Sequence, residues 1–275
     1  MVNAMGMGYV CGCDVGSTCG KAVIMDLSGK IVGSAIVRSK IDPEETSNLA
    51  LAEAMKTVPG LSGRRDFAYV IGTGYGGNQV PFADENISEI SCHAMGVHVT
   101  DPDVRTIIDI GGQDIKGICL DSDGSVENFA MNDKCAAGTG RFFENMARAF
   151  ETSVEEFSKL SLGAKSIVTI TSQCTVFAET EVISLVAKKK APADIAAGIE
   201  ASVAKRCYTL LLKAGIEPKV TMTGGCAKNV GLRQALEKTL RMELAVLNTD
   251  PQLMGALGAC EYARKHAVIA HNERR

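Results

Sequence analysis

The sequence lacks the features that would place the chain in a membrane, in a secretion pathway or on nucleic acid. No apolar run approaches the roughly 18 residues that a membrane-spanning helix needs, and the opening MVNAMGMGYV has neither the basic start nor the apolar centre of a signal peptide. The 29 basic and 32 acidic residues nearly balance, and the basic residues are scattered apart from KKK at 188–190. We therefore expect a cytoplasmic protein that binds neither membranes nor nucleic acid.

The chain also lacks any C-x-x-C motif, although it contains 10 cysteines. In a cytoplasmic chain of 275 residues, cysteines are more often thiols or metal ligands than disulfides. Cys11, Cys13 and Cys19 lie close together in the sequence, but the strand-and-turn pattern around them does not favour a metal site. Apolar neighbours predict that Cys13 and three further cysteines, Cys119, Cys207 and Cys260, are small buried side chains.

What the sequence does contain is an internal duplication. CDVGSTCGKAVIMDLSGKIV begins at Cys13, and IDIGGQDIKGICLDSDGSVE begins at Ile108, at a constant offset of 95 residues and without a gap. Each copy predicts a strand, an Asp-x-Gly turn, a second strand, an Asp-x-x-Gly hairpin and a third strand. The duplication predicts an α/β protein with two similar domains. The identical positions are Asp14/Asp109, Gly16/Gly111, Lys21/Lys116, Asp26/Asp121 and Gly29/Gly124.

The two Asp-x-Gly turns have the chemistry of a nucleotide site. A glycine directly after a strand frees backbone N–H groups to approach phosphate, hydroxyl groups add donors, and an aspartate at the strand end can hold the hydration shell of magnesium. Either turn alone would be ordinary hairpin chemistry, but the pair in register favours phosphate binding. The candidate phosphate-binding residues are Asp14, Gly16, Ser17, Thr18 and Lys21 in the first copy, and Gly111 and Gly112 in the second.

A third glycine turn, VTMTGGCAKN at 220–229, follows a strand of β-branched residues and precedes the helical stretch VGLRQALEKTL. A backbone loop at a helix N-terminus suits a phosphate or the adenosine of a nucleotide. We expect Gly224, Gly225, Lys228 and Asn229 to line that site. IGTGYGGN at 71–78 is a fourth glycine turn, which the pattern allows to be only a connection.

The stretch MNDKCAAGTGRFFENMARAF at 131–150 places Cys135 just before an amphipathic helix. Phe143, Met146, Ala147 and Phe150 form the apolar stripe of that helix. A cysteine at a helix start is more often a capping or packing residue than a metal ligand. On the residues alone, both interpretations stay open.

Taken together, these motifs resemble a known family. The paired Asp-x-Gly turns and the late Thr-Gly-Gly turn resemble the actin, Hsp70 and sugar-kinase superfamily of ATPases. Within it, GTGYGGN, SEISCHAMG, IDIGGQDIK, MNDKCAAGTGRF, CTVFAETEVISL and MTGGCAKN resemble activators of 2-hydroxyacyl-CoA dehydratases, from about Gly8 to Arg264. The resemblance implies a duplicated actin-like (ribonuclease H-like) fold with a nucleotide cleft between two domains. We expect residues 1–104 plus 252–275 in domain I and residues 105–251, with the cluster cysteines, in domain II.

The resemblance also implies that Cys135 and Cys174 bind iron. Two thiolates per chain cannot complete a four-cysteine site, so two copies of the chain would share one [4Fe–4S] cluster in a homodimer. Each cysteine would sit at a helix N-terminus, whose partial positive charge of about half a unit favours an anionic cluster.

The implied activity is ATP-driven electron transfer. A reduced ferredoxin or flavodoxin would supply one electron, and ATP would close the two domains so that the motion reaches the cluster-bearing helices. The electron would then pass to an iron–sulfur acyl-CoA dehydratase. Asp14 and Asp109 would hold Mg²⁺ through water, and Gln113 would orient the attacking water. Glu179, one helical turn from Cys174, could report the nucleotide state to the cluster or be an ordinary solvent-facing residue. The candidate catalytic residues are Asp109, Gln113 and Glu179.

Three alternatives remain open from the sequence. The chain could be one ATPase subunit of a benzoyl-CoA reductase, or the reductase of a double-cubane cluster protein, which keeps the chemistry and changes the partner. It could be a small-molecule kinase, although nothing outside the phosphate turns points to an acceptor site. A chaperone-like or filament-forming protein is disfavoured, because no substrate-binding domain follows the ATPase motifs.

Overall fold

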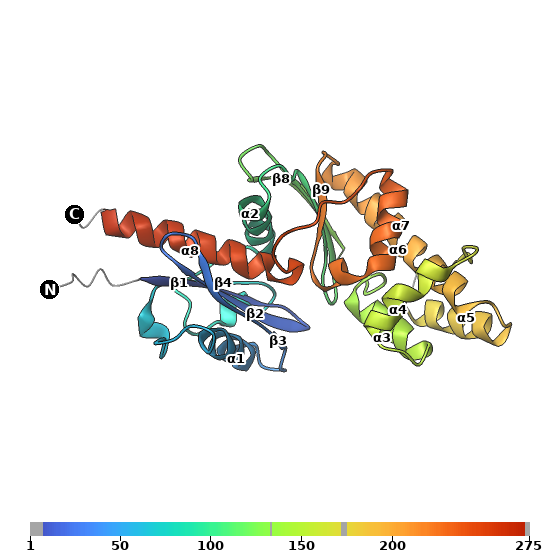
Figure 1. Ribbon diagram of the computed structural model, residues 1–275, viewed down its shortest axis with the longest axis horizontal. Helices are drawn as coiled ribbons and strands as arrows, with labels where there is room; N and C mark the ends of the chain where they lie inside the picture. Colours follow the sequence, from blue (N-terminus) through green and yellow to red (C-terminus); the bar gives the residue numbers. More distant parts are fainter. Residues whose placement is uncertain (1–7, 133, 172–174, 273–275) are drawn as a thin grey trace. The chain divides into compact units, whose positions relative to one another are not determined.

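The computed structural model describes residues 8–132, 134–171 and 175–272 (Figure 1). The chain forms two compact units. The first contains the described residues up to Pro102, the turn Asp123–Ser125 and the described residues from Asn248 onward. The second contains Asp103–Ser122 and the described residues of Val126–Leu247. No helix in the described part of the chain is long and apolar enough to cross a membrane.

The first unit is built on a five-stranded sheet in the order β3-β2-β1-β4-β5. β1 pairs antiparallel with β2 and parallel with β4. The side chains of β1 alternate between the two faces: Cys11 packs in the core with Ala50 and Leu51 of α1, whereas Gly12 lies against the backbone of α8 at Ala256. The strands are β1 (Tyr9–Val15), β2 (Cys19–Asp26), β3 (Ile31–Arg38), β4 (Phe67–Thr73) and β5 (Glu85–Asn86). The helices are α1 (Pro43–Met55), α2 (Glu89–Thr100) and α8 (Met254–Asn272).

The second unit has a four-stranded sheet in the order β8-β7-β6-β9. Its strands are β6 (Thr106–Ile110), β7 (Ile115–Leu120), β8 (Val126–Asn132) and β9 (Val220–Thr223). Its helices are α3 (Gly140–Ala149), α4 (Val154–Leu160), α5 (Thr175–Ala187), α6 (Pro192–Ala214) and α7 (Val230–Leu240). Across both units, short 3-10 helices span Arg64–Asp66 (η1), Gly77–Gln79 (η2), Ser161–Gly163 (η3), Gly225–Lys228 (η4) and Pro251–Leu253 (η5).

The predicted duplication is confirmed by the two sheets. β6, β7, β8 and β9 repeat the order and the strand directions of β1, β2, β3 and β4. The repeat extends to irregularities: the register shifts between Ile24 and Met25 and, 95 positions later, between Cys119 and Leu120. Such a bulge is a specific feature of a strand pair and is retained within families. The two units therefore share one architecture down to the pairing of individual residues.

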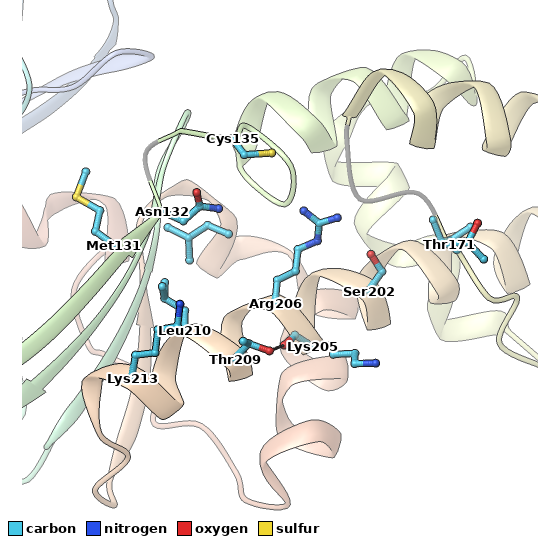
Figure 2. Close-up of a pocket in the computed structure, with 12 residues that line it drawn as sticks. Met131, Asn132, Cys135, Thr171, Ser202, Lys205, Arg206, Thr209, Leu210 and Lys213 are labelled. Atoms are coloured by element: carbon cyan, nitrogen blue, oxygen red, sulfur yellow. Dashed lines mark hydrogen bonds between the residues drawn. The ribbon is translucent and has the colours of Figure 1, made fainter.

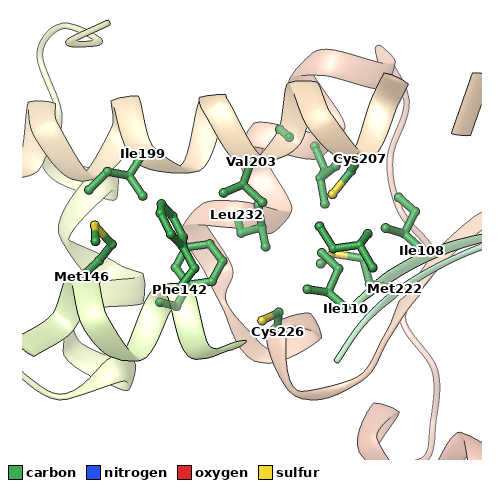
Figure 3. Packing of buried hydrophobic residues seen from close by; sticks show 14 of the residues in the cluster. Ile108, Ile110, Phe142, Met146, Ile199, Val203, Cys207, Met222, Cys226 and Leu232 are labelled. Atoms are coloured by element: carbon green, nitrogen blue, oxygen red, sulfur yellow. The ribbon is translucent and has the colours of Figure 1, made fainter. Parts of the chain in front are cut away.

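The core of the second unit fixes α3 against α6 and the sheet (Figure 3). Phe142 and Met146 of α3 are buried in one cluster with Ile199 and Val203 of α6 and with Ile110 of β6. This packing holds the start of α3, and the loop before it, in a defined place beside the sheet. The expected burial of four cysteines is also confirmed, for Cys13, Cys119, Cys207 and Cys260.

Candidate functional site

The first phosphate turn begins with a buried ion pair at the end of β1. Asp14 is 3% exposed, and it lies directly opposite Lys21 in the β1–β2 ladder. The Lys21 Nζ atom is 3.0 Å from Asp14 Oδ2. A buried carboxylate needs such a partner to offset the cost of leaving water.

The second turn repeats this arrangement with Asp109 and Lys116. Asp109 lies opposite Lys116 in the β6–β7 ladder, with Lys116 Nζ 3.3 Å from Asp109 Oδ2. Lys116 Nζ is also 2.9 Å from Asp114 Oδ1, and the Thr223 hydroxyl donates to Asp109 Oδ1 at 2.8 Å. Lys116 is 1% exposed, so this pair is buried more deeply than its counterpart. The carboxylate of Asp109 is thus held in one orientation at the end of β6.

The turns themselves also match. The Gly16 N–H donates to the Cys19 carbonyl oxygen at 3.1 Å, and the Gly111 N–H donates to the Asp114 carbonyl oxygen at 3.0 Å. Gly16, Gly111 and Gly112 are half-buried, and Gln113 is exposed. These turns keep the predicted phosphate-binding glycines within reach of a ligand.

Thr18 gives an independent sign that the first turn is built for a ligand. Ser17 and Thr18 are half-buried in the turn between β1 and β2. The Thr18 Oγ1 atom is itself buried and has no hydrogen-bond partner among the described residues. A buried hydroxyl without a partner is rare in a folded protein and requires an explanation. A phosphate oxygen or a magnesium-bound water would supply the missing partner.

The turns after β4 and β9 form a second equivalent pair, but the sequence predicted a nucleotide-binding role only for the turn after β9. Gly74 follows β4 and Gly224 follows β9, the two parallel neighbours of β1 and β6, and both have positive φ angles, 87° and 80°. A Cβ atom on Gly74 would lie 2.4 Å from Asp14 Oδ1, and one on Gly224 would lie 3.0 Å from Asp109 Oδ1. Glycine is therefore required twice, beside each buried carboxylate. The sequence allowed IGTGYGGN to be only a connection, and that interpretation did not include this role of Gly74. The Thr-Gly pair that follows both strands is the sequence signal that could have revealed it.

The Thr-Gly-Gly turn leads into a helix, as predicted, and the structure adds a side-chain cap at the start of that helix. Gly225 and Lys228 bound a short 3-10 helix and are exposed, whereas Asn229 is 5% exposed. The Asn229 side chain accepts a hydrogen bond from the Leu232 N–H at 2.9 Å and so caps α7. Asn229 therefore has a structural task at this turn in addition to any contact with a nucleotide.

A buried carboxyl group, Glu200, lies against the same helix start and was not predicted from the sequence. Glu200 is 1% exposed, and its carboxylate oxygens lie near the backbone of Gly231 and the hydroxyl of Ser161. Burial raises the pKa of Glu200 to about 7, although hydrogen bonding to Ser161 and Asn229 opposes the shift. A helical glutamate gives no sequence signal of burial, because α4, η3 and α7 cover it only in the folded unit.

We predict that Glu200 makes stability depend on pH. Because its folded pKa of about 7 exceeds the ordinary 4.5, the folded protein retains a proton that the unfolded chain loses. Stability should therefore fall by roughly 3 kcal/mol as the pH rises from about 4.5 to 7. Urea unfolding followed by circular dichroism should show that Glu200→Gln removes this slope, whereas the exposed control Glu243→Gln retains it. An unchanged slope in Glu200→Gln would contradict the assignment.

His93, in the SEISCHAMG stretch, lies beside the first carboxylate. It is 5% exposed on α2, and its Nε2 atom lies 3.0 Å from the point that a Cβ atom on Gly255 would occupy. Asp14 Oδ2 lies 2.8 Å from the same point. Because Gly255 has no side chain at the start of α8, the imidazole of His93 and the carboxylate of Asp14 can both lie beside it. No periodic pattern in the sequence singles out His93, since its place near Asp14 results from the packing of α2 on α8.

Cys135 lies in the loop between β8 and α3 and is half-buried (Figure 2). It lines an open hollow of about 750 Å³ in the second unit. The second expected ligand, Cys174, lies outside the described residues. Glu179 is half-buried on α5, and its role in sensing the nucleotide stays a prediction.

The chemistry of the described thiols fits Cys135 as a metal ligand. A metal binds the thiolate form of cysteine, and burial in apolar surroundings disfavours that form. Of the described cysteines, only Cys19 and Cys135 are partly exposed. Burial raises the pKa of the seven others: Cys11, Cys13, Cys92, Cys119, Cys207, Cys226 and Cys260.

The loop of Cys135 is connected through α3 to the second phosphate turn. The first two N–H groups of α3, those of Gly140 and Arg141, donate to the carbonyl oxygens of Gly111 and Gly112 at 2.9 and 3.0 Å. These N–H groups have no partner within their own helix, so the turn satisfies them. A movement of the phosphate turn would therefore be transmitted directly to the start of α3.

The duplicated sheets, with a carboxylate and a glycine turn at the same place in each, define the actin-like class of ATPase fold. Within it, the chain belongs to the BadF/BadG/BcrA/BcrD ATPase family, whose model matches residues 11–263.

Several relatives are similar over almost their whole length. The activator of lactoyl-CoA dehydratase from Anaerotignum propionicum is 45% identical, covering 94% of this chain and 98% of the relative. The structure of the activator of the 2-hydroxyisocaproyl-CoA dehydratase from Clostridium difficile, with bound ADPNP, is 44% identical with a TM-score of 0.91, covering 96% and 97%. One of the subunits of benzoyl-CoA reductase from Thauera aromatica is 32% identical, covering 96% of both chains.

Proposed function

We propose that this protein is an ATP-hydrolysing, iron–sulfur electron-transfer protein of the cytoplasm that activates a 2-hydroxyacyl-CoA dehydratase. The observation that supports it most is the link between Gly111 and Gly112 of the phosphate turn and the helix that follows Cys135. One short connection joins a nucleotide site to a candidate cluster ligand. The high identity to two dehydratase activators supports the same choice.

The nucleotide would be held by the duplicated turns. Ser17 and Thr18 would donate to phosphate in the first unit, and the Gly111 and Gly112 turn would do so in the second. Asp14 and Asp109, each fixed by its lysine, would each hold Mg²⁺ through water rather than directly. The remaining proposed nucleotide contacts are Gly16, Lys21, Gly224, Gly225, Lys228 and Asn229.

Gln113 is proposed to orient the water that attacks the γ-phosphate. It is exposed at the tip of the second turn, so its amide is available to a ligand. The N–H groups of Gly140 and Arg141 donate to the carbonyl oxygens of Gly111 and Gly112, so a movement of the turn would be transmitted through these hydrogen bonds and would change the position of the Cys135 loop. ATP turnover and the cluster environment are coupled in this way.

Cys135 and Cys174 are proposed as the iron ligands. Two copies of the chain would supply four thiolates to one [4Fe–4S] cluster, which makes the protein a homodimer. When bound, such a cluster supplies one-electron transfer at low potential. The electron would come from a reduced ferredoxin or flavodoxin and pass to the iron–sulfur dehydratase.

The function is tested by reconstitution. We expect that the anaerobically purified protein, with Mg-ATP and a reduced ferredoxin, will switch on a purified 2-hydroxyacyl-CoA dehydratase and that omitting ATP will abolish activation. The formation of the enoyl-CoA product is measured by absorbance. Activation that proceeds equally well without ATP, or no activation of any of several such dehydratases, would contradict the proposal.

The similarity to the Thauera aromatica benzoyl-CoA reductase chain supports a second candidate, an ATPase subunit of a heteromeric reductase. In that case the cluster would be shared with a related but non-identical chain. Expression of this chain alone separates the two candidates. A dimer that carries iron by itself supports the activator, and a protein that acquires iron only with a second chain supports the reductase component.

A further inference from the structure

The described charged residues that line the hollow beside Cys135 are basic. It is bounded by the Cys135 loop on one side and by α6 on the other (Figure 2), and it has a volume of about 750 Å³. Three of the described residues that line it are basic, Lys205, Arg206 and Lys213, and none is acidic. Among the described residues, the lining of the hollow therefore carries more basic than acidic side chains.

The basic residues are arranged along one face of a rigid helix. Lys205, Thr209 and Lys213 recur every four residues on α6, so they project from successive turns on the same side. Lys205 and Lys213 are exposed and lie eight residues apart, which is about 12 Å along the helix axis. Arg206 is half-buried and extends into the hollow between them (Figure 2). The positive charges of Lys205, Arg206 and Lys213 are therefore spread along α6 rather than gathered at one point, and these three residues form the basic strip.

We infer that this strip is the docking site for the acidic surface of the redox protein that delivers the electron. The inference rests on the proposed function, because it takes Cys135 to be a cluster ligand. A strip about 12 Å long suits several carboxylates spread over a protein surface. A single phosphate would instead need donors that converge on one point, which side chains two helical turns apart do not provide.

The position of the strip also suits electron delivery. Electron transfer slows steeply with distance, so a donor must bring its own cofactor close to the acceptor. A partner seated on α6 would lie beside Cys135, since both line the same hollow. Opposite charges raise the rate of encounter by one to three orders of magnitude at low salt and orient the partner as it arrives.

The experiment compares two double variants with the same change of charge. Lys205→Glu/Lys213→Glu reverses the strip, and Lys165→Glu/Lys238→Glu reverses two exposed lysines elsewhere in the same unit. An acidic bacterial ferredoxin is the probe. Calorimetry measures its binding in the oxidised form, and stopped-flow absorbance measures how fast its reduced form reduces the cluster. Photoreduced deazaflavin, a small reductant without an acidic surface, reports whether the cluster itself is intact.

We expect the strip variant to bind ferredoxin at least 10-fold more weakly than wild type at low salt, and to be reduced by it at least 10-fold more slowly. Reduction by deazaflavin should be unchanged, the control variant should resemble wild type, and the difference should vanish at high salt. Equal binding and equal rates in both variants would overturn the inference. So would a strip variant that becomes monomeric, since the hollow would then belong to a contact between two copies.

Two further outcomes separate this inference from the proposed function. If the strip variant receives electrons normally but no longer activates the dehydratase, the strip docks the acceptor and the inference is overturned. If the wild type holds no iron, the proposed function fails. Calorimetry still decides the docking question in that case, because ferredoxin binding that depends on Lys205 and Lys213 supports the site and its absence overturns it.

Discussion

Replacing Lys116 with methionine is expected to destabilise the second unit by about 3–5 kcal/mol, because it leaves a buried carboxylate without its cation. Lys116 is 1% exposed and pairs with both Asp109 and Asp114. Methionine keeps much of the apolar volume of the lysine stem, so the loss reflects charge rather than a cavity. Urea unfolding followed by circular dichroism, with hydrogen exchange to locate the unfolding unit, measures the effect.

The duplication supplies the matched control. Lys21→Met removes the equivalent cation from Asp14, but the Lys21 side chain is 15% exposed whereas that of Lys116 is 1% exposed, so the Lys21–Asp14 pair is less completely removed from water. We expect a loss of about 1–2 kcal/mol, nearer to that of a partly exposed pair. Equal losses of stability in the two variants would show that burial does not determine how much each ion pair contributes to the free energy of unfolding.

The second large effect is expected at the link between the phosphate turn and α3. Gly140 is the first residue of α3, a position that tolerates proline in a helix, and Thr139 before it is extended, with φ −92° and ψ 177°. Gly140→Pro should therefore leave α3 folded while replacing the N–H that donates to Gly111 with a ring carbon, which separates the start of α3 from the Gly111 carbonyl oxygen. We expect ATP hydrolysis to stay within about 3-fold of wild type and the electrons delivered per ATP to fall at least 10-fold.

Gly140→Ala is the control for this prediction, because alanine keeps the N–H group. Its Cβ would lie 3.3 Å from the Gly111 carbonyl oxygen, which requires a small adjustment of the turn. We expect coupling in this variant to stay close to wild type. Steady-state phosphate release and the rate of dehydratase activation, measured on the same sample, give the ratio. Full coupling in Gly140→Pro would remove this hydrogen bond from the mechanism.

The strand pattern and the paired carboxylates were accessible from the sequence because they depend on local chemistry. Strand alternation and Asp-x-Gly turns are recognised from residues that are neighbours in the sequence. A repeat at constant offset is found by comparing the sequence with itself, without knowledge of the fold. The ladder opposite Asp14 and Asp109 then follows, since a hairpin fixes which residues face each other. This is why the lysines at the matched positions pair with the aspartates in both units.

The residues that the sequence did not reveal owe their roles to packing between distant elements. Glu200 is buried by three segments that follow or precede it by many residues, and the His93 imidazole and the Asp14 carboxylate both lie beside the space that a side chain on Gly255 would fill. The role of Gly74 needed the parallel pairing of β4 with β1. The basic strip on α6 likewise has no recognisable role in the sequence, because only the fold brings this helix face next to the Cys135 loop.

The central claim is that two copies of this chain hold one iron–sulfur cluster through Cys135 and Cys174. The most direct measurement is iron and acid-labile sulfide per protomer after anaerobic purification, for wild type, Cys135→Ser and Cys174→Ser. The partly exposed Cys19, as Cys19→Ser, serves as the matched control. We predict about two iron and two sulfide per protomer in a dimeric wild type and in the control, and none in either of the other variants. A wild type that is free of iron but hydrolyses ATP, or iron that survives both substitutions, would contradict the account.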